Sequence, residues 1–65
     1  KCVLKAMNTV VVKTISGNGN AVAALIDNMN IDWIVGTIAG DDTIFAVAKN
    51  EEDADKIVAE LTALL

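Results

Sequence analysis

Two apolar segments joined by a short polar turn occupy the middle of the chain, where residues 33–48 read WIVGTIAGDDTIFAVA. The segments Trp33–Ala39 and Thr43–Ala48 are rich in β-branched and aromatic residues, which favour strands. Between them, Gly40-Asp41-Asp42 has the composition of a hairpin turn, and we expect the glycine to supply an unusual backbone angle. The pattern therefore predicts two antiparallel strands.

Two further strands and a helix are predicted before this hairpin. Cys2–Met7 is a short strand candidate, and Val10–Ile15 is β-branched throughout except at Lys13, with Asn8-Thr9 as the expected turn. Residues 16–19, SGNG, then have turn composition. Apolar residues next recur at spacings of 0, +3, +4 and +7, which predicts one face of a helix over roughly residues 20–28: Val22, Leu25, Ile26 and Met29.

The last segment is the clearest helix. Asn50 suits an N-cap, and the acids at residues 51–53 place negative charge on the first turn. One apolar stripe follows, made of Ala54, Ile57, Val58, Leu61, Leu64 and Leu65. The order of elements predicts a single α+β domain over residues 1–65, a two-layer ββαββα fold in which two helices cover one face of a four-stranded, mainly antiparallel sheet.

The predicted strands do not alternate between apolar and polar residues. A sheet with one face in water should alternate, but Thr43–Ala48 and Val10–Val12 place apolar groups on both faces. Two helices cannot cover both faces of one sheet. We therefore expect the second face to be buried in a homo-oligomer, whereas an exposed apolar patch of ordinary size is the simpler alternative.

Composition supports an oligomer and excludes other ways of stabilising so short a chain. The 65 residues are 54% apolar, with one cysteine and no histidine. An internal disulfide is therefore impossible, and a structural zinc site has too few ligands. Few side chains could serve in acid–base catalysis, so we expect that the chain is not an enzyme and has no catalytic residues. We also expect no metal and no cofactor.

The net charge of the chain and its first residues indicate which partners and which cellular location to expect. A net charge of −4 is a poor match for nucleic acid. No apolar run approaches 20 residues, so no membrane contact is expected, and the single cysteine fits a cytoplasmic setting. Because the chain starts at Lys1 without a signal-peptide pattern, we interpret it as a fragment of a longer protein.

Residues 36–45, GTIAGDDTIF, resemble the signature of the bacterial arginine repressor family, in its C-terminal domain. Thr14-x-x-Gly17 before the first helix also agrees with the family pattern, and the resemblance extends over essentially the whole chain. One departure is Ser16, where family members often carry proline. The resemblance implies a hexamer, built as a dimer of trimers, with L-arginine bound between the trimers as co-repressor. It also implies that operator DNA is bound only through an N-terminal winged helix-turn-helix domain, which is absent here.

The resemblance assigns Asp41 and Asp42 to arginine binding. A guanidinium matches a carboxylate, and the chain has no arginine of its own to neutralise these acids. Neighbouring side chains in an extended segment point to opposite sides, so the two acids could serve different ligand sites. Taken alone, however, the spacing of Gly-Asp-Asp favours a solvated turn, and the family match is what reverses this in favour of ligand binding. A metal pair is disfavoured because hard cations need six or more oxygens.

Four further residues enter the candidate site by resemblance. The backbone groups of Thr37 and Ala39 line it, and Asn20 and Asp27, two helical turns apart, contact the ligand. By themselves these residues fit ordinary strand packing, a helix start and a solvated acid. A structural oligomerisation module that does not sense arginine therefore remains the alternative function.

Overall fold

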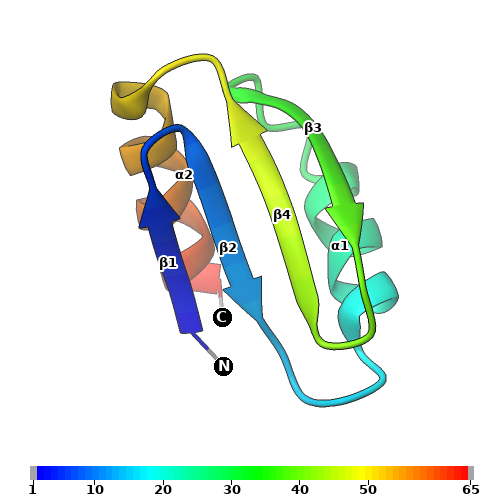
Figure 1. Ribbon diagram of the computed structural model, residues 1–65. Helices are drawn as coiled ribbons and strands as arrows, with labels where there is room; N and C mark the ends of the chain where they lie inside the picture. The colour runs from blue at the N-terminus through cyan, green and yellow to red at the C-terminus, as the bar shows by residue number, and fades with distance from the viewer. Residues whose placement is uncertain (1, 65) are drawn as a thin grey trace.

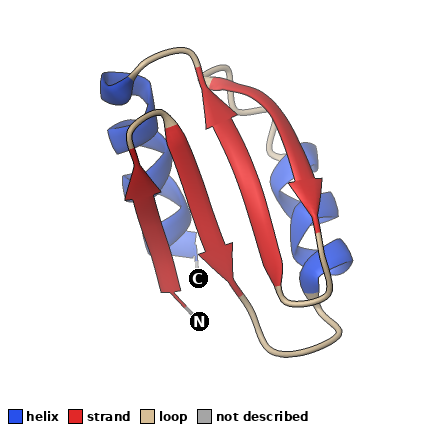
Figure 2. Cartoon of the chain, in the orientation of Figure 1, coloured by secondary structure: helices blue, strands red, loops and turns tan. Residues whose placement is uncertain are grey.

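The computed structural model describes residues 2–64 and has the expected order of elements. These are β1 (Cys2–Ala6), β2 (Thr9–Lys13), α1 (Gly19–Asn28), β3 (Ile34–Ala39), β4 (Thr43–Ala48) and α2 (Glu51–Leu64). The strands lie in the order β1-β2-β4-β3, and all three pairs are antiparallel. Both helices cover the same face of the sheet (Figures 1 and 2). The predicted two-layer α+β fold is confirmed.

Turn chemistry differs from the prediction at two places. Ala6 pairs with Thr9, so the first turn is Met7-Asn8 and not Asn8-Thr9, and Met7 has a φ of 56°. In the second hairpin the expectation for Gly40 is wrong, because among the described glycines the positive φ, 88°, belongs to Gly17. The unusual angle is needed in the loop that enters α1, while Asp41-Asp42 closes the hairpin with negative φ values.

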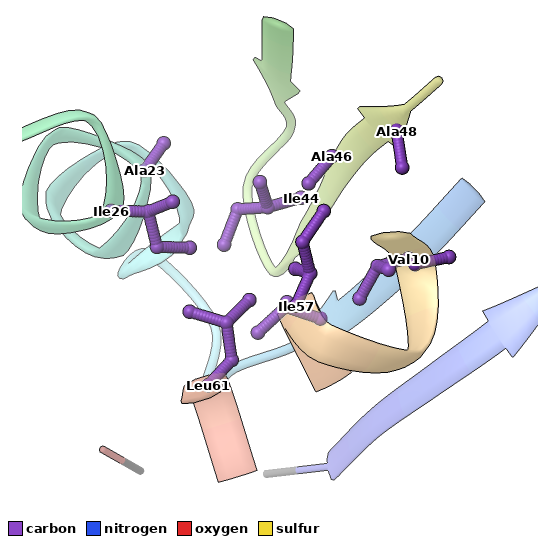
Figure 3. Packing of buried hydrophobic residues seen from close by; sticks show 10 residues of the cluster. Val10, Ala23, Ile26, Ile44, Ala46, Ala48, Ile57 and Leu61 are labelled. Atoms are coloured by element: carbon purple, nitrogen blue, oxygen red, sulfur yellow. The ribbon is translucent and has the colours of Figure 1, made fainter. Parts of the chain in front are cut away.

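The core lies between the helices and the two central strands (Figure 3). It is formed by Val10, Val12, Ala23, Ile26, Ile44, Ala46, Ala48, Ala54, Ile57 and Leu61. The predicted helix stripes are partly wrong, since Leu25 and Leu64 are exposed and the α1 face is centred on Ala23 and Ile26. Leu65 lies outside the described residues.

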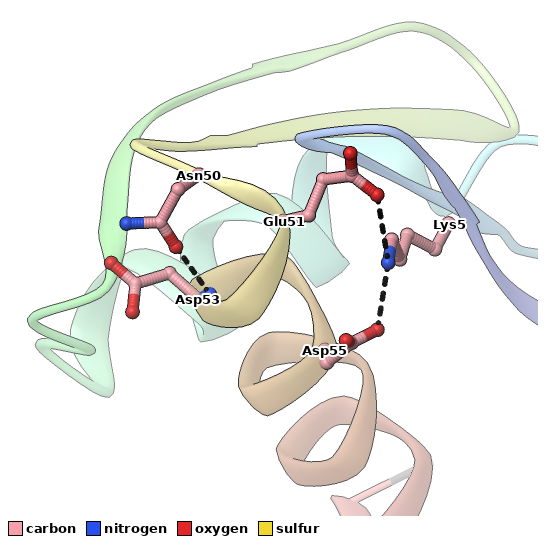
Figure 4. A network of polar contacts seen from close by, with 5 residues as sticks. All are labelled: Lys5, Asn50, Glu51, Asp53 and Asp55. Carbon is pink, nitrogen blue, oxygen red and sulfur yellow. Dashed lines mark hydrogen bonds and ion pairs between the residues drawn. The ribbon is translucent and has the colours of Figure 1, made fainter.

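Polar contacts fix the start of α2 (Figure 4). The Asn50 Oδ1 accepts a hydrogen bond from the Asp53 N–H at 2.8 Å, which confirms the predicted N-cap. Lys5 Nζ on β1 lies 3.0 Å from Asp55 and 3.5 Å from Glu51. The hydrogen bond to Asp55, with a smaller contribution from Glu51, raises the pKa of Lys5 above its ordinary value. These contacts tie the edge strand β1 to α2.

The face of the sheet away from the helices is apolar. Cross-strand register places Leu4, Val11, Phe45 and Ile38 in one row across the four strands, with Val47 in the next row. Ile38 is 69% exposed and Leu4 56%. We call these five residues the open sheet face. It explains why the strand sequences do not alternate: both sides are apolar, and the helices cover one of them.

Neither helix found in residues 2–64 has the length and apolar character that crossing a membrane requires.

Candidate functional site

The turn at the end of β3 is held by the loop that leads into α1. The carbonyl oxygen of Asp41 accepts hydrogen bonds from the N–H groups of Gly17 (3.2 Å) and Gly19 (2.8 Å). The carbonyl of Asp42 accepts one from the Thr14 N–H at 2.7 Å. Gly19 is buried, and a Cβ there would overlap the carbonyl oxygen of Gly40. The loop and the turn therefore form one unit, in which Asp41 satisfies a donor at the start of α1.

The two carboxylates of this turn face different groups. Asp41 Oδ2 accepts hydrogen bonds from the Ser16 hydroxyl at 2.9 Å and from the Gly17 N–H at 3.2 Å. Asp42 Oδ1 accepts one from the Thr43 hydroxyl at 2.9 Å, and that hydroxyl accepts one from Lys13 Nζ at 2.9 Å. Asp41 thus faces the loop before α1, whereas Asp42 lies beside Thr43 and Lys13 at the end of the open sheet face. Both acids are exposed.

Strand β3 is an edge of the sheet, so half of its backbone groups have no neighbouring strand. The Gly40 N–H donates to the Thr43 carbonyl at 2.7 Å, which makes this a hydrogen-bonded pair. Bonded and non-bonded pairs alternate along an antiparallel ladder. Ala39, opposite Ile44, and Thr37, opposite Ala46, are therefore non-bonded pairs. Their backbone N–H and C=O groups point to the free edge, where a ligand or another chain can reach them.

Side chains connect this edge strand to α1. The Thr37 hydroxyl donates a hydrogen bond to Asp27 Oδ1 at 3.0 Å. Asn20 lies two turns earlier, on the first turn of α1, directly after the Gly19 that contacts Asp41. Asn20 and Asp27 are exposed and Thr37 is half-buried. The α1–β3 seam therefore carries polar groups from its start at the turn to Asp27.

The six residues predicted for the site are arranged along a surface and are not gathered in one cavity. A hollow of about 220 Å³ at the far end of the seam includes only Asp27 of the six and is lined by Ile26, Asp27, Asn30, Ile31, Ile34, Val35 and Gly36. A shallower one of about 290 Å³ includes only Ala39 and is lined by Ile38, Ala39, Gly40, Thr43 and Phe45. Exposed carboxylates and free backbone donors beside an apolar hollow suit a ligand shared between chains.

Sequence reasoning missed the residues that position the turn. The sequence gives Ser16, Gly17 and Gly19 no place in the site, yet all three contact Asp41 or Gly40. The signal was present in the two glycines of the SGNG segment, one needed for its backbone angle and one for a close approach. What the sequence could not show is that this loop, more than 20 residues from the turn, packs against it.

Residues 2–64 contain no group of three or more His, Cys, Asp or Glu side chains placed to hold a metal ion. The thiol of Cys2 is exposed on the first strand.

Known proteins resemble this chain over nearly its full length. The family described as arginine repressor, C-terminal domain, matches residues 3–63. The chain is 57% identical to the arginine repressor of Clostridium novyi over 58 residues, which are 89% of this chain and 38% of that protein. It is 48% identical to that of Thermotoga maritima over 61 residues, 94% of this chain and 40% of that protein. With the arginine repressor of Clostridium tetani the identity is 52% over 58 residues, which are 89% of this chain and 38% of that protein.

Proposed function

The chain belongs to the arginine repressor family, matching its C-terminal domain, and on that premise we propose that it binds L-arginine and assembles through its open sheet face. Arginine repressors are transcription regulators and not enzymes. The chain spans about two fifths of the length of the curated relatives it matches. In our proposal, operator DNA is bound by a winged helix-turn-helix domain outside these 65 residues, and the whole protein regulates arginine metabolism in the cytoplasm.

One observation carries the ligand assignment: two exposed carboxylates occupy one tight turn, and neither forms an ion pair within residues 2–64. Among residues 2–64, no ion pair involves Asp41 or Asp42, and the cation near them, Lys13, contacts Thr43 instead. An arginine side chain supplies a planar cation with parallel N–H donors that suit a carboxylate. Each acid keeps one carboxylate oxygen without a hydrogen bond from residues 2–64, because the bonds to Asp41 reach Oδ2 and the bond to Asp42 reaches Oδ1.

The α-carboxylate and the ammonium group of arginine have candidate partners along the α1–β3 seam. The free backbone N–H groups of Thr37 and Ala39 suit the α-carboxylate of arginine, and their carbonyls suit its ammonium. Asp27 adds a carboxylate and Asn20 an amide at the two ends of the seam. Because these groups lie on an open surface, a single copy cannot surround the ligand. The site is completed by the same surface of another subunit.

The open sheet face is the proposed contact within a trimer. Leaving five large apolar side chains in water is costly, and burying them against symmetric copies removes that cost. Two trimers then meet at the exposed Asp41-Asp42 turns, with arginine between them. A ligand that binds only the assembled state shifts assembly toward the hexamer by mass action.

Titration calorimetry tests the ligand assignment. We expect L-arginine to release or absorb heat with the native chain, and Asp42→Asn, which keeps the shape but removes the charge, to weaken binding by at least about 10-fold. Asp32→Asn removes an exposed charge outside the proposed site and should bind as the native chain does. Absence of heat at millimolar arginine with a folded sample would contradict the assignment.

A structural oligomerisation module is the second candidate, and the contacts of Asp41 favour it. Its carbonyl and one carboxylate oxygen satisfy donors of residues 16–19, so this acid has a role even without a ligand. Under this alternative, oligomers form at the same protein concentration with and without arginine, and Asp42→Asn has no effect on assembly.

A further inference from the structure

Asp41 is held through both its main chain and its side chain. Its carbonyl oxygen accepts two backbone hydrogen bonds, which fix the main chain, but they leave the side chain free to rotate. The side chain accepts a hydrogen bond from the Ser16 hydroxyl at 2.9 Å, and the Gly17 N–H, which is shared with the carbonyl oxygen, also donates to it at 3.2 Å. Among the side chains of residues 2–64, only that of Ser16 donates a hydrogen bond to this carboxylate. A substitution at Ser16 can therefore remove that bond.

Both donors contact the same oxygen. An ionised carboxylate offers about four acceptor positions over its two oxygens. Because Ser16 and Gly17 both contact Oδ2, Oδ1 has no hydrogen bond from residues 2–64 and can accept hydrogen bonds from a ligand. Gly17 keeps a φ of 88°, which shapes the loop so that its N–H and the neighbouring hydroxyl reach the same atom.

We propose that Ser16 is a positioning residue for arginine recognition: its hydroxyl fixes the Asp41 carboxylate with Oδ1 turned toward the ligand. The inference rests on the proposed arginine site and deepens it. The Ser16 hydroxyl and the Gly17 N–H together hold the carboxylate in this chain.

The expected size of the effect follows from the cost of ordering a side chain on binding. That cost is about 0.5–1.5 kcal/mol, which corresponds to roughly 2- to 12-fold in Kd. When Ser16 holds Asp41 in place beforehand, the ligand does not have to order it. Ser16→Ala should therefore weaken arginine binding by this factor. Ser16→Thr, which keeps the hydroxyl, should bind within about 2-fold of the native chain.

Calorimetry with L-arginine on the native chain, Ser16→Ala and Ser16→Thr tests the inference. A second measurement needs no ligand: three-bond N–Cγ and C′–Cγ couplings of Asp41 report its χ1 rotamer. We expect one dominant rotamer in the native chain and in Ser16→Thr, and averaging over rotamers in Ser16→Ala. A residue that only stabilised the loop would leave the Asp41 rotamer unchanged in every variant. Because Ser16 is exposed, none of these variants should unfold the domain.

The outcomes separate this inference from the proposed function. If the native chain gives no heat with arginine, the proposed function fails, and the inference with it. If the native chain binds while Ser16→Ala binds equally well, only the role of Ser16 is overturned. Tighter binding by Ser16→Ala also overturns it, because the hydroxyl would then compete with the ligand for the carboxylate. If Ser16→Thr and Ser16→Ala lose arginine affinity equally and the Asp41 couplings are unchanged, the role of Ser16 is also overturned.

Discussion

Gly19, at the start of α1, lies directly against the carbonyl oxygen of Gly40 at the end of β3. A Cβ on Gly19 would overlap that oxygen and come within 2.9 Å of the Asp41 carbonyl. The same residue donates its N–H to Asp41 at 2.8 Å. The start of the helix is thus in backbone contact with the turn that carries the two acids. Any change that separates them moves the acids relative to the α1–β3 seam.

Gly19→Ala should destabilise the domain by about 1–3 kcal/mol, because the added methyl group meets rigid backbone that cannot rotate away. Urea unfolding followed by circular dichroism measures the loss. Gly36→Ala is the matched control, since its Cβ meets nothing within 4 Å. Equal stability of the two variants would show that α1 does not depend on this close approach.

Thr37→Val removes the hydroxyl that bonds Asp27 while keeping the shape of the side chain. We expect weaker arginine binding, by several-fold, because the Asp27 carboxylate loses a fixed orientation at one end of the seam. Thr37→Ser keeps the hydroxyl and should bind as the native chain does. Calorimetry compares the three proteins, and identical affinities would show that this hydrogen bond does not contribute to arginine binding.

Ile38→Lys places a charge in the middle of the open sheet face. Because the Ile38 side chain points away from the core, the fold of the subunit should persist, while burial of an unpaired lysine between copies should disrupt assembly. Ala59→Lys puts the same charge on the exposed side of α2 and should leave assembly intact. Sedimentation velocity distinguishes the two, and an unchanged oligomer in Ile38→Lys would place the interface elsewhere.

Lys5→Gln tests the contact between β1 and α2. The pKa of Lys5 is raised, mainly by its hydrogen bond to Asp55, so the charged form is favoured in the folded chain. The stabilisation is fully present below the unfolded-state value of 10.5 and is lost as the pH rises through the higher folded-state pKa. Native chain and variant should therefore differ in Tm at neutral pH and low salt, and converge at high pH.

Lys49→Gln removes an exposed lysine elsewhere and is the control for Lys5→Gln. Salt near 1 M should also reduce the difference, since the Debye length falls to about 3 Å. A difference between Lys5→Gln and the native chain that persists above the folded-state pKa would mean that the side chain acts through packing and not through its charge.

Most of the fold could be predicted because local signals agreed with one another. The Asn50 cap, the acids that follow it and the apolar stripe gave α2 correctly, and the lack of alternation in Thr43–Ala48 indicated a sheet that is apolar on both faces. The errors lie where tertiary packing outweighs local pattern. Leu25 follows the helical spacing but faces outward, because the sheet contacts α1 along Ala23 and Ile26.

The candidate site was less accessible to sequence reasoning. The assignment of all six residues, Asp41 and Asp42 included, depended on the family resemblance. Their arrangement follows from topology: β3 is an edge strand, and α1 runs beside it. No spacing in the sequence states that residues 16–19 pack against residues 40–42, since that contact depends on how the two hairpins associate.

Light scattering of the native chain after size exclusion, with and without L-arginine, tests most directly whether the ligand controls assembly. Each chain has a mass of 6.8 kDa. We expect arginine to shift the species toward six times this mass, and Asp42→Asn, at the same concentration, not to respond. A mass that is the same with and without saturating arginine, in a folded sample, would show that arginine does not join the subunits.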